Sequence, residues 1–366
     1  MPLYRRAGRR AFRLLRPLAL PFLTRLQRRV AAGVDGSDTA LRSLMSVEKL
    51  NALQAATARL EARLTGIEAL LATVADGQRL EARLTGIEAL LAAVADGQQS
   101  LLQRRAIALG EEVLARTPHG WLLLPAEDVR LVAAMVESGG QLEPGTAAVV
   151  QALLEPGDLA VDAGANVGML TLAMAHAVGA AGSVLAIEPT PRLAALLRRS
   201  RTLSFPEGVI TVEAVALGAE RGTAALSIGP TCGHNSLVRL SDETASVSVP
   251  VRRLDDILPP EARPALVKLD VEGFELEVWR GMARTIAAAP DLAVIVEFGP
   301  SHLARAGIAI ADWIGTFLDS GFTPWEIAED SATIQPLRTD RLDRVFSMNI
   351  LLLRADPARW PRLVRA

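Results

Sequence analysis

Short apolar runs that each end in an acidic residue recur through the second half of the chain. These runs cover residues 159–161, 183–187, 265–269 and 292–296. The acids that follow them are Asp162, Glu188, Asp270 and Glu297. Short, nearly continuous apolar runs are typical of strands buried on both faces of a parallel sheet. The carboxyl ends of such strands meet at one edge, so we expect the four acids to share a crevice.

The segments around these runs predict the rest of an α/β fold. Further strands are expected at 120–125, 208–217, 322–327 and 346–353. Helices are expected at 128–138, 146–154, 169–177, 192–200, 277–289 and 312–320. The alternating, β-branched segments 223–228 and 246–251 predict an added antiparallel ribbon. The small polar loop 229–237 between them is a candidate cover for a pocket.

A glycine-rich turn, Asp162-Ala-Gly-Ala-Asn-Val-Gly168, joins the first of these strands to its helix. Gly164 can adopt backbone angles closed to other residues and lets a ligand approach the main chain. Glu188 ends the next strand, roughly 20 residues on, where such sheets hold a ribose hydroxyl pair. The turn and this acid predict a nucleotide site. Its cofactor-binding residues would be Asp162, Gly164, Asn166, Gly168 and Glu188.

The acid in front of the first glycine bears on which nucleotide binds. A dinucleotide turn has the pattern G-x-G-x-x-G, whose second glycine lets the pyrophosphate sit on the backbone. Asp162 stands in front of Gly164 here and would repel a diphosphate. S-adenosylmethionine carries an ammonium and a sulfonium and no phosphate, so the charges favour it. An NAD-dependent oxidoreductase is the alternative enzyme class.

Five other residues are candidates for the chemistry at the acceptor. Asp270 and Glu272 would lie on one side of a strand that continued through them, and Lys268 would share that side. Two close carboxylates suit a general base, and they equally suit oxygen ligation of a divalent cation such as Mg²⁺. His234 in the polar loop is another candidate base, as is His302 after the last of the apolar runs. The sequence leaves open the identity of the base and any dependence on metal.

Taken together, these motifs resemble one family. The segments Val161–Gly168, Glu188-Pro189, Val267–Glu275 and Val296–Phe298 are similar to the FkbM family of S-adenosylmethionine-dependent methyltransferases. The run Lys-x-Asp-x-Glu-Gly-x-Glu is the most discriminating, and the resemblance covers roughly residues 120–353. It implies a class I methyltransferase (Rossmann-like) sheet, mostly parallel with an antiparallel edge strand. It also implies O-methylation of a sugar, glycan or natural-product hydroxyl.

The amino-terminal segment 1–36 is a basic tail with nine arginines and no acid in its first 30 residues. Interleaved apolar residues suit an anionic membrane surface, although a disordered tail has the same composition. Its longest early apolar run, 17–23, is far shorter than the roughly 20 residues of a membrane span, and no signal peptide is predicted. The net charge of −2 gives no signal for nucleic acid. The single cysteine, Cys232, fits a reducing compartment, so we expect a cytoplasmic protein with membrane contact at the inner face.

Segment 37–104 carries a tandem repeat and precedes the predicted methyltransferase domain, 105–366. Residues 60–79 and 80–99 differ only at Thr73/Ala93 and Arg79/Gln99. Three-four spacing of apolar residues in each copy predicts a helical coiled coil that self-associates, with a solvated single helix as the alternative. The sequence does not settle the oligomeric state, or whether the helix breaks at Asp76-Gly77. A third hypothesis is a non-catalytic scaffold in which only the tail and the coiled coil function.

Overall fold

The computed structural model describes residues 106–366 except 230, 232, 234 and 239–244. The basic tail, the coiled-coil segment and His234 lie outside these residues, and so do Cys232 and part of the polar loop. In the described part of the chain, no helix combines the length and apolar character needed to cross a bilayer.

A nine-stranded sheet forms the centre of the fold, in the order β15-β13-β12-β14-β11-β10-β4-β5-β6. The parallel strands in its middle are the predicted apolar runs: β4 (Leu159–Ala163), β5 (Ser183–Ile187), β6 (Ile210–Glu213), β10 (Leu266–Leu269) and β11 (Ala293–Phe298). They are buried almost throughout, as their composition predicts. The mostly parallel α/β sheet is therefore confirmed.

The antiparallel strand β14 (Met348–Leu353) pairs with β11 on one side and with β12 (Thr323–Ala328) on the other. It therefore lies inside the sheet and not at its edge. Two further strands, β13 (Thr333–Pro336) and β15 (Val364–Arg365), extend the sheet beyond β12. The seven strands from β6 to β12 thus form a class I methyltransferase sheet with one strand reversed.

Helices connect the strands and bury their apolar sides on the sheet. They are α6 (Pro144–Leu153), α7 (Met169–Val178), α8 (Pro191–Ser204), α10 (Glu275–Gly281), α11 (Ala283–Ala288), α12 (Pro300–Ala306) and α13 (Ile310–Asp319). The helix predicted at 277–289 is in fact two helices that meet at Met282. A Cβ at Gly281 would lie 2.1 Å from the carbonyl oxygen of Gly218, so this glycine lets another loop approach closely.

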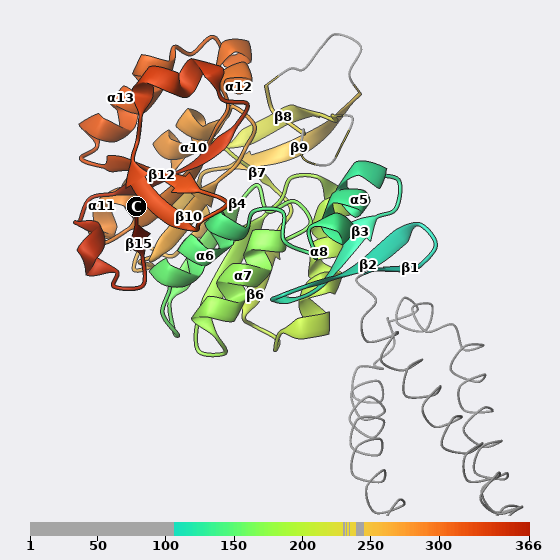
Figure 1. Ribbon diagram of the computed structural model, residues 1–366. Coiled ribbons are helices and arrows are strands. Elements are labelled where there is room, and N and C mark those ends of the chain that lie inside the picture. Colours follow the sequence, from blue (N-terminus) through green and yellow to red (C-terminus); the bar gives the residue numbers. More distant parts are fainter. Residues whose placement is uncertain (1–105, 230, 232, 234, 239–244) are drawn as a thin grey trace, which may run out of the picture. The chain divides into compact units, whose positions relative to one another are not determined.

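A small antiparallel sheet precedes this domain, formed by β1 (Ala106–Ala108), β2 (Glu112–Thr117) and β3 (Gly120–Pro125). Helix α5 (Val129–Glu137) follows it. The free edge of β3 faces α8, where Ser204 Oγ accepts from Trp121 N and Ser200 Oγ accepts from Leu123 N, both at 2.9 Å. Figure 1 shows this sheet beside α8.

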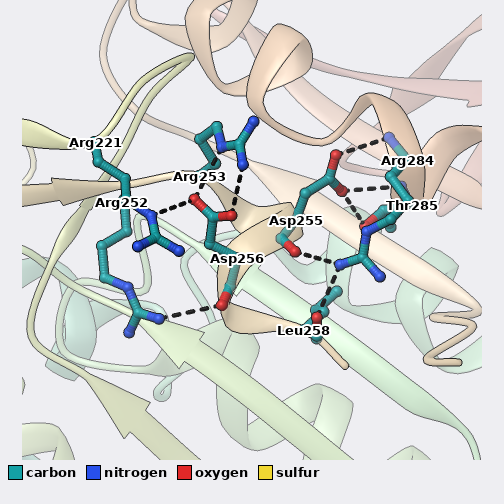
Figure 2. A network of polar contacts seen from close by, with 8 residues as sticks. All are labelled: Arg221, Arg252, Arg253, Asp255, Asp256, Leu258, Arg284 and Thr285. Atoms are coloured by element: carbon teal, nitrogen blue, oxygen red, sulfur yellow. Dashed lines mark hydrogen bonds and ion pairs between the residues drawn. The ribbon is translucent and has the colours of Figure 1, made fainter. Parts of the chain in front are cut away.

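The predicted ribbon is confirmed as β8 (Gly222–Ser227) paired with β9 (Ser246–Arg252). The strand predicted at 208–217 is divided, because β7 (Ala216–Leu217) leaves the central sheet to pair with β9. Figure 2 shows how helix α9 (Leu254–Ile257) joins the ribbon to the domain. Asp256 accepts from Arg221 and Arg253, and Asp255 accepts from the backbone N–H groups of Arg284 and Thr285 at the start of α11.

Candidate functional site

The glycine turn after β4 is shaped by close contacts with its neighbours. Gly164 has φ +80°, and a Cβ at this position would lie 1.7 Å from the carbonyl oxygen of Asp270. Gly168 has φ +99° at the start of α7, where a Cβ would lie 2.1 Å from Leu197 Cδ1. Both positions favour glycine by their backbone conformation, and Gly164 also requires it because the atom it would meet belongs to the backbone.

Glu188 is held in a fixed orientation at the end of β5. One carboxylate oxygen accepts from Asn166 N and the other accepts from Thr190 N, each at 2.8 Å. Burial raises the pKa of Glu188, and these hydrogen bonds oppose the rise. The turn and the acid predicted to bind one ligand are thus joined directly to each other.

A pocket of about 640 Å³, partly open to solvent, lies at the carboxyl ends of the strands. Gly164, Asn166 and Glu188 line one part of it, and Asp270 and Glu272 line another. Its apolar wall comes from the side chains of Ile187, Val215, Leu217, Leu226, Leu237, Val271 and Phe274. Three of the five predicted cofactor residues and two of the predicted acceptor residues therefore share one cavity.

Asp162 and Gly168 are not among the residues that line this pocket. The Asp162 side chain is buried and accepts a 2.5 Å hydrogen bond from Thr171 Oγ1 of helix α7. Burial raises its pKa, while the charge of Lys268 opposes the rise. Asp162 therefore ties the strand to the following helix and does not face the cavity.

Lys268 is buried and its Nζ donates a 2.7 Å hydrogen bond to Asp270 Oδ2. Burial alone would lower the pKa of Lys268, but the charges of Asp270, Asp162 and Glu143 raise it above the usual value. Burial alone would raise the pKa of Asp270, but Lys268 and a hydrogen bond with Glu297 hold it below the usual value. Lys268 does not line the pocket, and its ion pair with Asp270 favours the ionised form of that carboxylate.

Glu272 lines the pocket from a turn, and not from a continued strand as predicted. Strand β10 ends at Leu269, and Glu272 lies in a turn with φ +57°, so strand alternation does not apply to it. Burial, Asp270 and Glu275 raise the pKa of Glu272 to about 8. Its Oε2 lies 3.1 Å from His302 Nε2. Both carboxylates line the pocket, although the expected geometry was wrong.

Two groups lie behind Asp270 and Glu272. His302, on helix α12, has its Nδ1 3.9 Å from Glu297 Oε2 at the end of β11. Burial and the charge of Asp270 hold the pKa of Glu297 well above its usual value. Glu275 is buried, its Oε1 accepts from Gly273 N at 2.9 Å, and burial raises its pKa to about 7. The sequence did not identify Glu275 as a site residue, although it is the last residue of the Lys-x-Asp-x-Glu-Gly-x-Glu run.

The polar loop contacts both parts of the pocket through two side chains, Asn235 and Ser236, that the sequence did not single out. Asn235 lines the cavity, and its side chain donates to Thr190 Oγ1 at 3.1 Å and accepts from Gly229 N at 3.0 Å. Ser236 Oγ donates to the carbonyl oxygen of Glu272 at 2.7 Å. The described residues of this loop therefore do cover the pocket, as predicted. The candidate base His234 lies outside the described residues.

The sheet order and the pocket define a class I methyltransferase fold. Residues 162–324 match the family model described as the methyltransferase FkbM domain, which confirms the resemblance found in the sequence.

Two curated relatives share this part of the chain. It is 34% identical over 144 residues to Methyltransferase 1 of Beauveria bassiana, covering 33% of this chain and 57% of that protein. It is 33% identical over 156 residues to Methyltransferase sdnD of Sordaria araneosa, covering 33% of this chain and 59% of that protein. The chain thus spans less than two thirds of the length of these relatives.

The similarity to solved structures is more distant. A SAM-dependent O-methyltransferase from Thermotoga maritima is 15% identical with a TM-score of 0.32, covering 66% of this chain and 77% of that one. Fibrillarin from Aeropyrum pernix, solved with bound S-adenosylmethionine, is 13% identical with a TM-score of 0.35. The match covers 68% of this chain and 84% of the fibrillarin chain. The fold assignment therefore depends on the strand order of the present sheet.

Proposed function

We propose that the chain is an S-adenosylmethionine-dependent methyltransferase that methylates a hydroxyl group of a sugar, glycan or natural product. One observation carries the proposal. Among the described residues that line the pocket, every ionisable side chain is an acid: Glu188, Asp270 and Glu272. Such a wall attracts the sulfonium and ammonium of this donor and repels the phosphates of a dinucleotide. The match to a methyltransferase family agrees with this assignment.

The donor is proposed to lie along the turn 164–168, with its ribose at Glu188. The backbone N–H groups of Asn166 and Thr190 fix the Glu188 carboxylate at the pocket wall. A fixed carboxylate at this strand end is the usual partner of a ribose hydroxyl pair. The methionine end of the donor then points along the turn toward Asp270.

The acceptor hydroxyl is proposed to lie beside Asp270. In the transfer step, the hydroxyl oxygen forms a bond to the methyl carbon while the carbon–sulfur bond breaks. The electron pair of that bond stays on sulfur, giving S-adenosylhomocysteine, and the hydroxyl proton passes to Asp270 and then to solvent. Asp270 can accept it because Lys268 keeps this carboxylate ionised at neutral pH.

The nature of the pocket wall supports an alcohol on a ring or chain skeleton as the acceptor. Carboxylates accept hydrogen bonds from hydroxyl groups, and the apolar wall formed by Leu226, Leu237 and Phe274 can pack against carbon. The NAD-dependent oxidoreductase is disfavoured, because the described pocket wall offers no cation to a diphosphate. The scaffold hypothesis is disfavoured because acids from two separate segments, Glu188 after β5 and Asp270 with Glu272 after β10, converge on one cavity.

Other parts of the proposal concern the residues outside the described region and depend on the sequence alone. The protein is proposed to be cytoplasmic, and its basic tail 1–36 is proposed to contact anionic lipid at the inner face of the membrane. Segment 37–104 is proposed to self-associate through its coiled-coil seam. With a net charge of −2, no role in nucleic-acid binding is proposed.

Calorimetric titration with S-adenosylhomocysteine tests the donor site directly. We expect one equivalent to bind per chain, and Glu188→Gln to weaken binding at least about tenfold, because a charged hydrogen-bond acceptor contributes about 1.5–3 kcal/mol. Glu220→Gln, at an exposed acid outside the pocket, is the matched control and should bind like the wild type. A folded wild type that ignores S-adenosylhomocysteine but enhances NADH fluorescence would overturn the proposal in favour of the oxidoreductase.

A further inference from the structure

We propose that Glu272, Glu297 and His302 bind a divalent cation at the acceptor end of the pocket, with Mn²⁺ as the best-matched ion. The sequence left open whether a metal is present, and suggested Asp270 and Glu272 as its ligands. The structure points to a different set of side chains, one from each of three segments. This inference rests on the proposed function for the role of the ion, but its binding can be measured separately.

The three side chains converge closely enough to share one ion. Each offers one ligand atom, and all three atoms lie within 4.8 Å of one another. Neighbouring and opposite ligands around an ion with bonds of about 2.1 Å are roughly 3.0 and 4.2 Å apart. The 3.1 Å separation of Glu272 Oε2 and His302 Nε2 matches a neighbouring pair. The 4.8 Å limit exceeds the separation of opposite ligands by about 0.6 Å, so a movement of this size would bring all three atoms within bonding distance of one ion.

A shielded oxygen supplies an independent indication of a ligand. Glu297 Oε2 is covered from solvent and has no hydrogen-bond partner among the described residues. Glu297 also lies within hydrogen-bonding reach of Asp270. Two carboxylates at this distance need either a proton or a cation to offset their repulsion. A cation on Glu297 would also satisfy this oxygen, which has no hydrogen-bond partner among the described residues.

The backbone around the cluster is built to accommodate the imidazole. A Cβ at Gly299 would lie 2.8 Å from His302 Nδ1, and a Cβ at Gly273 would lie 3.2 Å from the His302 carbonyl oxygen. Glu272 takes φ +57°, a backbone conformation that is strained for a residue with a side chain. Two glycines and one strained residue thus hold His302 and Glu272 together.

The donor set indicates the kind of ion. Carboxylates suit Mg²⁺, Ca²⁺ and Mn²⁺, whereas imidazole suits transition metals. Mn²⁺ satisfies both preferences. In the described region no other group of three His, Cys, Asp or Glu side chains converges in this way.

The position of the cluster gives the ion a role in the proposed reaction. Glu272 lines the pocket, so an ion on its carboxylate lies next to the acceptor hydroxyl. A carboxylate such as that of Asp270 is by its ordinary chemistry a weak base for an alcohol. A divalent cation acts as a Lewis acid and lowers the pKa of an oxygen bound to it, so that a weak base suffices.

Titration of the full, tag-free chain with MnCl₂ in the absence of substrate tests the site, with calorimetry and the electron paramagnetic resonance signal of free Mn²⁺ as readouts. We expect one equivalent to bind to the wild type. Glu297→Gln and His302→Gln should each weaken binding at least about tenfold, since even the outer-shell partners of metal ligands have effects of this size. Glu277→Gln, which removes an exposed acid of α10, should bind Mn²⁺ like the wild type.

Two outcomes would overturn the proposal: a wild type that binds no Mn²⁺ at millimolar concentration, or binding that both ligand variants retain in full. Thermal melting of each variant identifies any loss of binding that comes from unfolding. S-adenosylhomocysteine titration of the same samples separates the two proposals, because the donor site can be intact when the metal site fails.

Discussion

Glu188 and Asp270 are both acids of one pocket, yet their partners give them different properties. The carboxylate of Glu188 accepts two backbone hydrogen bonds, and burial raises its pKa. Asp270 pairs with the buried ammonium of Lys268, which lowers its pKa. Glu188 is therefore suited to orient hydroxyl groups of a ligand, whereas Asp270 is held as an ionised carboxylate at the pocket wall, as the proposed proton acceptor requires.

Gly164→Ala tests the most crowded contact of the site. The new Cβ would lie 1.7 Å from a backbone carbonyl oxygen, and the residue would keep φ +80°. Strain and overpacking together predict a loss of about 2–5 kcal/mol in the free energy of unfolding, measured by urea denaturation. Gly307→Ala is the matched control: φ is +69° in the left-handed helical region and no atom lies within 4 Å, so we expect a loss of only about 1–2 kcal/mol. Equal losses in the two variants would contradict the steric explanation.

Single positions show what the sequence can and cannot predict. The need for glycine at 164 followed from the motif, but the group that approaches it is the Asp270 carbonyl of this chain. Asp162 and Glu188 end neighbouring strands in similar patterns, yet only Glu188 lines the pocket. The difference depends on Thr171, whose hydroxyl donates to Asp162 from the next helix. Contacts of this kind are absent from a pattern of apolar and acidic residues.

At the scale of elements, helix α8 does more than cover the central sheet. Its Ser200 and Ser204 accept hydrogen bonds from the free edge of β3, so the helix satisfies edge groups that a neighbouring strand would otherwise pair. The helix also packs against β6 of the central sheet. It therefore joins the small sheet to the central sheet, with two serine hydroxyls accepting from the main chain of β3.

Ser200→Ala should weaken this junction. Ser200 is fully buried, and its loss would leave the N–H of Leu123 without a partner in an apolar environment. We expect the free energy of unfolding to fall by about 1–3 kcal/mol, with faster hydrogen exchange at Leu123. Thr202→Ala, on the exposed side of the same helix, should change stability by less than about 0.5 kcal/mol. If Leu123 exchanges equally slowly in both variants, the serine does not hold the strand edge.

The sequence predicted elements best where the apolar pattern was continuous. The strands 159–163, 183–187 and 293–298 follow the apolar runs closely, because burial on both faces of the sheet demands such runs. Prediction failed at the junction of α10 and α11 and at α12. The junction depends on the approach of a distant loop to Gly281, and α12 begins at Pro300, within a segment that reads as a loop.

At the scale of the whole molecule, the register of the central strands assembles the site. Lys268 of β10 lies opposite Asp162 on β4 and Ile295 on β11, so the three strands end near one level. The residues that follow, among them Gly164, Asp270 and Glu297, are therefore brought together by strand order. The sequence predicted this convergence, except that Asp162 turns toward the following helix.

The tandem repeat leads to a prediction about the full chain. Leu64 and Leu84 occupy equivalent seam positions of the two copies, so Leu64→Glu with Leu84→Glu places charges inside the predicted coiled coil. We expect sedimentation equilibrium to show a wild-type oligomer and a variant near the monomer mass of 38.9 kDa. Thr65→Glu with Thr85→Glu adds the same charges beside the seam and should leave the oligomer intact. A monomeric wild type would favour the solvated single helix.

The burial of Lys268 also determines how the chain reacts with amine-modifying reagents. Lys49 and Lys268 are its only lysines, and the Lys268 ammonium is covered and paired with Asp270. Acylating agents attack accessible, deprotonated amines, so they reach this position only when the surrounding strands separate. The rate of Lys268 acylation, followed by mass spectrometry, thus reports how often β10 separates from the strands around it.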